Sequence, residues 1–151
     1  MGHFAVAVFT SDENQSIHDL LTPHGQNVEV KPYVYVARAQ LDSYEIGGHW
    51  KDWLILKNKG EIFARLKTKT CDAAFVRDIN FEAMRRRKTA FSTYDVITPD
   101  GIWHAIGEMD SRCISPTAPE DEDAWEIHYY DRFIKPALDN NCYLTVVDCH
   151  I

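Results

Sequence analysis

The stretch Cys142–Cys149 reads CYLTVVDC and predicts a strand in the middle of a sheet. Five of the six residues from Tyr143 to Asp148 are apolar or β-branched, a continuous run that is typical of a strand buried on both faces. The polar triplet Asp139-Asn140-Asn141 stands directly before it and is suited to end a helix. We therefore expect the rest of the chain to be built around this segment.

Other segments read as strands or extended chain. The apolar run His3–Phe9 (HFAVAVF) predicts a buried strand, and Phe91–Ile97 and Ile102–Ile106 flank the turn sequence Thr98–Gly101 (TPDG), which predicts a hairpin. Val28–Val36 alternates apolar and polar residues, and its Pro32 favours an edge strand or an extended arm.

The middle of the chain gives a mixture of signals. Trp53–Leu56 and Ile62–Leu66 predict two strands joined by a turn at Lys57–Gly60. From Asp72 to Arg87 the apolar residues have nearly helical spacing, and Asn80 interrupts it, so we expect two short helices there.

The principal helix is expected near the C-terminal end, at about Asp121–Leu138. The acidic run Glu120–Asp123 would place negative charge at its first turn, as the helix dipole favours. A single helical turn is also expected at Ser16–Leu21. The predicted buried stripe of the long helix is Ala124/Trp125, Ile127/His128, Tyr130 or Asp131, and Ile134. These elements predict an α+β fold, a single domain over residues 1–151 with a largely antiparallel sheet and one principal C-terminal helix packed on it.

Composition limits the class of protein. With 151 residues, 45% of them hydrophobic, and no linker-like tract, the chain can bury one core as a single domain. No run is long and apolar enough for a membrane span, and the first residues lack the features of a signal peptide, so we expect a cytoplasmic protein of a bacterial host with no membrane association. The four cysteines form no C-x-x-C pair, so we expect free buried thiols, no structural metal and no cofactor.

Charge is distributed unevenly. The formal net charge is −7, which disfavours general binding of duplex nucleic acid. Residues Lys51–Lys88 nevertheless carry 11 basic and 5 acidic side chains, so the remainder of the chain carries −13. The densest basic run, Met84–Lys88, reads either as a solvated helix face or as a site for phosphate groups.

Three motifs together resemble a known family. They are YEIGGHW at Tyr44–Trp50, DGIWHAIGEM at Asp100–Met109 and LTVVDCHI at Leu144–Ile151. They are similar to a family of small proteins encoded by tailed bacteriophages and prophages, with an I-G-G-[R/H]-W segment, a D-G-x-W…G-E-M hairpin and a terminal D-C-H-I. His49 stands where that family more often has Arg. The resemblance implies a phage origin and implies no particular reaction.

The first candidate site combines glycines, aromatic rings and basic residues. Adjacent glycines let the backbone approach a ligand closely, indole rings can stack on a base, and Arg side chains can bind phosphate. This combination predicts a site for a small anionic, nucleotide-like ligand, although a turn and core packing also explain most of these residues singly. The candidate ligand-binding residues are Tyr44, Gly47, Gly48, His49, Trp50, Trp53, Arg85, Arg86 and Arg87.

The second candidate site is at the C-terminal end of the chain. Asp148 and His150 share one face of a strand because they are two residues apart. A carboxylate and an imidazole so placed can orient an acid–base group or ligate a metal, and His104 or Glu108 would complete three ligands. The alternative is that both side chains only anchor the last strand.

Three functions remain open from the sequence. The leading one is a phage-type accessory protein that binds a small anionic ligand or a host defence protein and thereby counteracts host defence. The second is a metal-assisted hydrolase or nuclease acting on nucleotides, with Asp148, His150, His104 and Glu108 as its weak candidates for catalysis. The third is an acidic mimic that blocks a nucleic-acid-binding partner. All three are compatible with a homo-oligomer.

Overall fold

The computed structural model describes residues 2–24, 43–58, 71–85, 91–105 and 125–150. The predicted arm at Val28–Val36, the strand at Ile62–Leu66 and the acidic start of the long helix lie outside the described residues. Within the described ranges, six strands form one mixed sheet.

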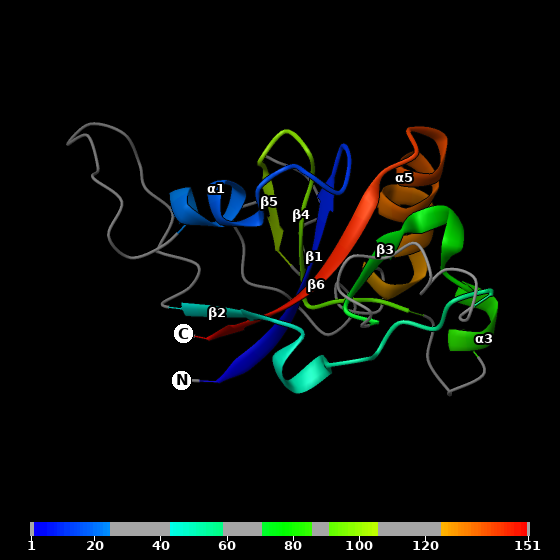
Figure 1. The fold of residues 1–151 in the computed structure, drawn as a ribbon, viewed down its shortest axis with the longest axis horizontal. Coiled ribbons are helices and arrows are strands. Elements are labelled where there is room, and N and C mark those ends of the chain that lie inside the picture. The colour runs from blue at the N-terminus through cyan, green and yellow to red at the C-terminus, as the bar shows by residue number, and fades with distance from the viewer. Residues whose placement is uncertain (1, 25–42, 59–70, 86–90, 106–124, 151) are drawn as a thin grey trace.

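The predicted central strand is β6 (Tyr143–His150), and the prediction is confirmed because β6 has partner strands on both of its edges. It pairs antiparallel with β1 (His3–Thr10) along its whole length. Its other edge pairs antiparallel with β2 (Ser43–Ile46) and with β3 (Ala73–Phe75). Figure 1 shows β1 and β6 side by side in opposite directions, with both chain ends at the same side of the molecule.

The predicted hairpin is also confirmed. It consists of β4 (Asp95–Ile97) and β5 (Trp103–Ala105), which pair antiparallel, and Gly101 has a φ of 83° in the turn between them. β4 pairs with β1 in parallel, whereas the other strand pairs in the described part of the sheet are antiparallel. The strand order is β2-β6-β1-β4-β5. The α+β class with a largely antiparallel sheet is therefore correct.

The two faces of the sheet bury separate groups of side chains. Ala7, Phe9, Leu144 and Val146 point into the larger core, which the C-terminal helix covers. Alternate residues point the other way, into a smaller core under the short helix α1 (Ile17–Leu21), as the period of two in a strand requires. The α1 helix begins at the expected place, where the Ser16 side chain accepts a hydrogen bond from the backbone N–H of Asp19. It runs into the 3₁₀ turn η1 (Thr22–His24).

The buried stripe of the C-terminal helix is partly as predicted: Trp125 and Ile134 are buried as expected, and the positions between them differ. The chain is helical over 125–129, continues as the π-helix η4 (Tyr130–Ile134) and ends as α5 (Lys135–Asp139). Ile127, expected in the core, is 72% exposed, whereas Trp125, Tyr129 and Phe133 are buried. The buried positions Trp125, Tyr129 and Phe133 follow a spacing of four, which keeps them on one face of the helix.

Two predictions for the middle of the chain are wrong. Trp53–Leu56 is not a strand: its backbone makes single bonds to the segment after residue 70, for example from Leu54 N–H to Cys71 O at 3.2 Å. The first predicted helix after Asp72 is instead β3 followed by the 3₁₀ turn η3 (Val76–Asp78), because these residues pair with β6. The second helix is present as α3 (Phe81–Arg85).

None of the helices in the described residues is long and apolar enough to cross a membrane.

Candidate metal centre

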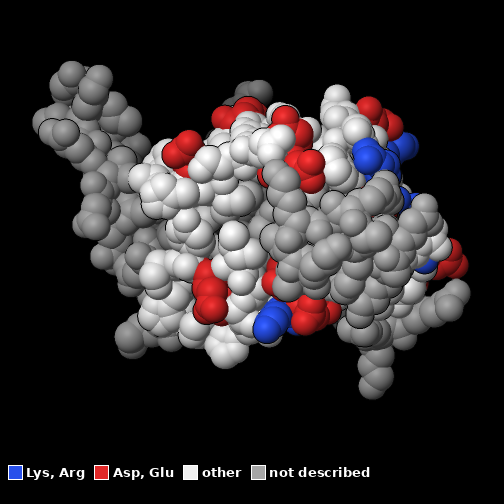
Figure 2. Space-filling view, viewed as in Figure 1, with Lys and Arg blue, Asp and Glu red and all other residues white. Residues whose placement is uncertain are grey.

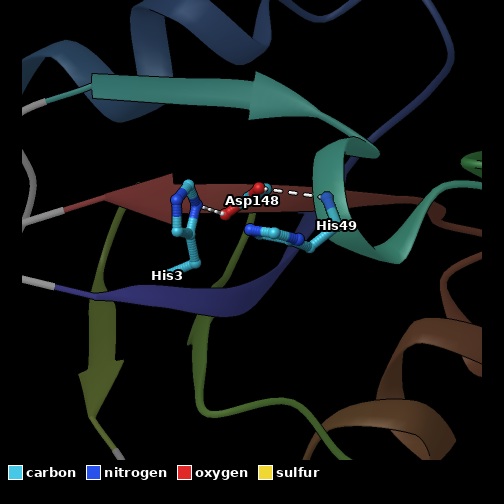
Figure 3. A group of neighbouring side chains, drawn as sticks. All are labelled: His3, His49 and Asp148. Atoms are coloured by element: carbon cyan, nitrogen blue, oxygen red, sulfur yellow. Dashed lines mark hydrogen bonds and ion pairs between the residues drawn. The ribbon is translucent and has the colours of Figure 1, made fainter.

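Three side chains from distant parts of the chain meet at one end of the sheet. His3, His49 and Asp148 each offer a ligand atom, and these atoms lie within 4.8 Å of one another. Figure 3 shows the His3 and His49 side chains approaching the Asp148 carboxylate from β1 and from the 3₁₀ turn η2 (Gly48–Trp50). The described residues contain no other group of this kind.

The register of β1 against β6 determines the first half of the cluster. His3 lies directly opposite His150, and Ala5 lies opposite Asp148. Residues opposite each other on antiparallel strands share a face, as do residues two apart on one strand. His3, Asp148 and His150 are therefore on one face, and His3 Nδ1 lies 2.8 Å from Asp148 Oδ1.

The two glycines determine the second half. Gly47 and Gly48 both have positive φ, 77° and 52°, so the chain turns sharply after β2. A Cβ atom on Gly48 would collide with the Asp148 carboxylate, which shows how closely the turn lies over that side chain. The tight approach lets the backbone N–H of His49 donate to Asp148 Oδ2 at 3.0 Å. The predicted close backbone approach is therefore made to side chains of this protein, to Asp148 at Gly48 and to Asp72 at Gly47.

The burial of the cluster is graded. Asp148 is only 4% exposed, whereas the side chain of His3 is 46% exposed and His49 is exposed. Both carboxylate oxygens have a hydrogen-bonding partner, so Asp148 is held in one orientation. A fixed carboxylate beneath two accessible imidazoles is a ligand arrangement that opens toward solvent.

A third imidazole borders the cluster. The ring centroids of His3 and His49 are 4.2 Å apart, and those of His3 and His150 are 4.9 Å apart. His150 is thus beside the group without being part of it. His49 from the first predicted site and Asp148 and His150 from the second therefore lie side by side in the structure.

The aromatic residues of the first predicted site are divided. Trp50 stays near, with its ring centroid 6.0 Å from that of His49, and is partly buried against the larger core. Trp53 packs on Phe91, 5.1 Å between centroids. Tyr44 lies opposite Cys149 in the sheet, on the reverse face, and its hydroxyl is 2.9 Å from His18 Nδ1.

The remaining predicted residues are not brought to this cluster. His104 is on β5, where its Nε2 is 3.2 Å from Thr98 Oγ1 and its ring packs on Phe133. Arg85 ends α3, and the structure does not describe its side chain. Arg86, Arg87 and Glu108 lie outside the described residues. His3 and His49 take the two ligand positions that the sequence argument gave to His150 and to His104 or Glu108.

His3 is the site residue that the sequence argument missed. It was treated only as the first residue of an apolar strand. The signal that could have found it is that two long apolar runs, at opposite ends of the chain, each have a histidine at the outer end. Antiparallel pairing of those runs would place the two histidines opposite each other.

The described thiols are separate from the site. Cys71, Cys142 and Cys149 are free and buried, as expected, and Cys113 lies outside the described residues. Cys149 follows Asp148 but points to the smaller core on the reverse face. Burial, with smaller contributions from the charges of Asp95 and Asp148, raises the pKa of Cys149 to about 12, so it is not a nucleophile here.

A cavity of about 510 Å³ lies at the opposite end of β1 and β6. Buried Phe9, Phe133 and Cys142 line it together with exposed Arg132. It shares no residue with the His3–His49–Asp148 cluster.

Comparisons of the chain with protein-family models, with curated proteins and with solved structures found no match. The resemblance to the phage family therefore stays a prediction.

Proposed function

We propose that the protein binds one divalent transition-metal ion through His3, His49 and Asp148 and acts as a metal-assisted hydrolase. The observation that carries this proposal is the convergence of two imidazoles and a carboxylate, with ligand atoms within 4.8 Å of one another, from residues 3, 49 and 148. Two nitrogens and one oxygen suit Zn²⁺ and similar ions better than Mg²⁺ or Ca²⁺, which favour all-oxygen sites.

The distances are compatible with such an ion after a small movement. Zn²⁺ binds nitrogen and oxygen at about 2.0 to 2.2 Å, which places neighbouring ligand atoms roughly 3.3 Å apart in a tetrahedral site. His3 Nδ1 and Asp148 Oδ1 are already 2.8 Å apart. The exposed His49 side chain would have to move toward the other two ligands. The ion would take the place of the hydrogen bond between His3 Nδ1 and Asp148 Oδ1.

Three protein ligands leave a fourth position for water or substrate, as in catalytic zinc sites. A bound divalent ion lowers the pKa of water to about 7 and polarises an ester or phosphoryl oxygen. This chain contributes the buried carboxylate that fixes the ligand geometry and the two accessible imidazoles that face solvent.

Calorimetry with Zn²⁺ and Co²⁺ tests the metal centre. We expect one ion per chain for the natural sequence and a loss of affinity of tenfold or more in His3→Ala, His49→Ala and Asp148→Asn. His104→Ala is the matched control, because it removes a histidine that lies outside the cluster. Equal affinities for all five proteins would show that the cluster is not the binding site.

Hydrolysis is tested separately with chromogenic substrates. Bis(p-nitrophenyl) phosphate and p-nitrophenyl acetate should be cleaved by the natural protein and by His104→Ala in the presence of Zn²⁺, and not by Asp148→Asn under the same conditions. If the protein binds the metal ion but does not turn over esters, phosphodiesters or nucleotides, the proposed hydrolase activity is wrong. The ion would then have a structural or ligand-binding role.

The second candidate function is a phage-type accessory protein that binds an anionic, nucleotide-like ligand without turnover and counteracts host defence. The observation favouring ligand binding is that Trp50 and the positive-φ glycines lie at the same site as the histidines. Native mass spectrometry of the freshly purified protein distinguishes the candidates, because a binder would retain an intact ligand and a hydrolase would convert it.

A further inference from the structure

We infer that the ligand of this site is a small phosphate-bearing molecule whose anionic group binds the metal ion directly. The inference rests on the proposed metal centre and adds the class of ligand. It follows from the charges, the accessibility and the aromatic neighbour of the cluster, taken in that order.

The three side chains of the cluster carry no permanent positive charge. The ion pair that involves the cluster joins His3 to Asp148, and no described Lys or Arg forms one with Asp148. Glu45 lies directly opposite Asp148 on β2, so it adds a second carboxylate on the same face. Without a metal ion, the two carboxylates make this face unfavourable for an anion.

A divalent ion reverses the local charge. Together with one carboxylate and two neutral imidazoles it gives a centre with a net charge of +1. The ion would then lie between the buried carboxylate of Asp148 and the two exposed imidazoles, on the side of the cluster that is open to solvent. An anionic oxygen would therefore bind at the open coordination position rather than on a side chain.

The neighbouring indole indicates the rest of the ligand. Trp50 is half-buried, and its ring centroid is 6.0 Å from that of His49, on the same 3₁₀ turn. A ligand with its phosphate on the ion can place a flat ring over this turn, where base–indole contacts are favourable. A nucleoside monophosphate has both groups, whereas inorganic phosphate has only the first.

The experiment uses the full chain loaded with Co²⁺, whose visible spectrum changes when a ligand enters the coordination sphere. AMP, inorganic phosphate and the uncharged nucleoside adenosine are titrated into the loaded and the metal-free protein. We expect AMP and phosphate to change the spectrum, adenosine to leave it unchanged, and calorimetry to detect AMP binding only with metal present.

Two variants sharpen the result. Trp50→Ala should weaken AMP about tenfold and leave phosphate unchanged, because only AMP uses the ring. Glu45→Gln should tighten both anions several-fold at low salt and lose this effect at high salt, because it removes an exposed negative charge that is not a ligand. His104→Ala should behave like the natural protein.

The failures are distinguishable. If Co²⁺ does not bind, the proposed metal centre fails, and this inference fails with it. If Co²⁺ binds and AMP binds equally well to metal-free protein, the centre stands and the direct contact between anion and metal is wrong. If Co²⁺ binds and neither anion changes the spectrum, the class of ligand is wrong and the metal site is retained.

Discussion

Gly48 and Asp148 depend on each other at the scale of single residues. Gly48 has a φ of 52°, and a Cβ atom on it would collide with the Asp148 carboxylate. A side chain at this position is therefore excluded both by backbone conformation and by space. The same contact holds His49 over the carboxylate, so the metal ligands and the glycine belong to one structural unit.

We predict that Gly48→Ala loses the metal site and destabilises the fold. The left-handed conformation alone costs roughly 1 to 2 kcal/mol for an L-residue, and displacement of Asp148 adds to it. Urea unfolding and Zn²⁺ calorimetry measure the two effects. Gly2→Ala is the control, since nothing lies within 4 Å of a Cβ there. A Gly48→Ala protein with unchanged stability and affinity would contradict the close contact.

Thiol chemistry gives a second prediction at this scale. With a pKa of about 12, only about one in ten thousand Cys149 side chains is ionised at pH 8, and burial also raises the pKa of Cys142. We expect both to resist iodoacetamide in the native protein and to react fully in urea, as followed by peptide mass spectrometry. Equally rapid alkylation of Cys149 in the native state would show that the strand opens readily.

Sequence reasoning was most successful for residues whose role is local. The adjacent glycines Gly47 and Gly48 indicate a close backbone approach, which their positive φ allows, and His49 and Asp148 are both among the predicted site residues. His3 was not, because its partner is 145 residues away along the chain. Its role depends on the register of two strands, and no short-range pattern encodes that register.

At the scale of elements, the π-helix η4 determines which helix face is buried. Tyr129 and Phe133 are in the core, whereas Ile127 is 72% exposed. The apolar residues alone did not predict this, because the expected stripe assumed 3.6 residues per turn throughout. The buried Tyr129 hydroxyl contacts Thr93 Oγ1 at 2.6 Å, which fixes the helix against the segment before β4.

We predict that Phe133→Ala lowers the free energy of unfolding by about 3 to 5 kcal/mol and that Ile127→Ala changes it by less than about 0.5 kcal/mol. The first change leaves a cavity between the helix and the sheet, and the second removes a side chain already in water. Chemical denaturation of both variants provides the comparison. A larger loss of stability for Ile127→Ala than for Phe133→Ala would contradict this assignment of the buried helix face.

The elements that were predicted correctly have strong local signals. The sequence TPDG specifies the turn between β4 and β5, and Ser16 caps α1. Trp53–Leu56 has the composition of a strand, but among the described residues its β-pairing is an isolated bridge between Leu56 and Ile79. Whether such a segment becomes a strand depends on a partner with free backbone groups, which composition does not reveal.

At the scale of the whole molecule, charge is spread unevenly over the surface. Figure 2 shows acidic side chains at several places on the viewed face and basic ones mainly near one end. The acidic mimic remains a hypothesis compatible with this surface. The mimic requires no metal ion. Variants that lose metal binding should therefore keep the activity of a mimic and lose the function proposed above.

The proposed centre also joins the two ends of the chain. His3 is at the start of β1, Asp148 is near the end of β6, and His49 follows β2, so an ion would link three segments that are distant in sequence. Such a link forms only when β1, β2 and β6 are paired. An ion that binds the folded chain and not the unfolded chain must therefore stabilise the whole sheet.

We predict that Zn²⁺ at a hundred times its dissociation constant stabilises the protein by about 2.7 kcal/mol, which corresponds to a rise in Tm of roughly 5 to 11 °C for a chain of this size. Thermal unfolding followed by circular dichroism measures the rise, and a chelator should reverse it. In His3→Ala and Asp148→Asn the rise should fall to about half or less at the same Zn²⁺ concentration, whereas His104→Ala should keep the full rise. A rise that survives in His3→Ala and disappears in His104→Ala would place the ion on β5, away from the joined chain ends.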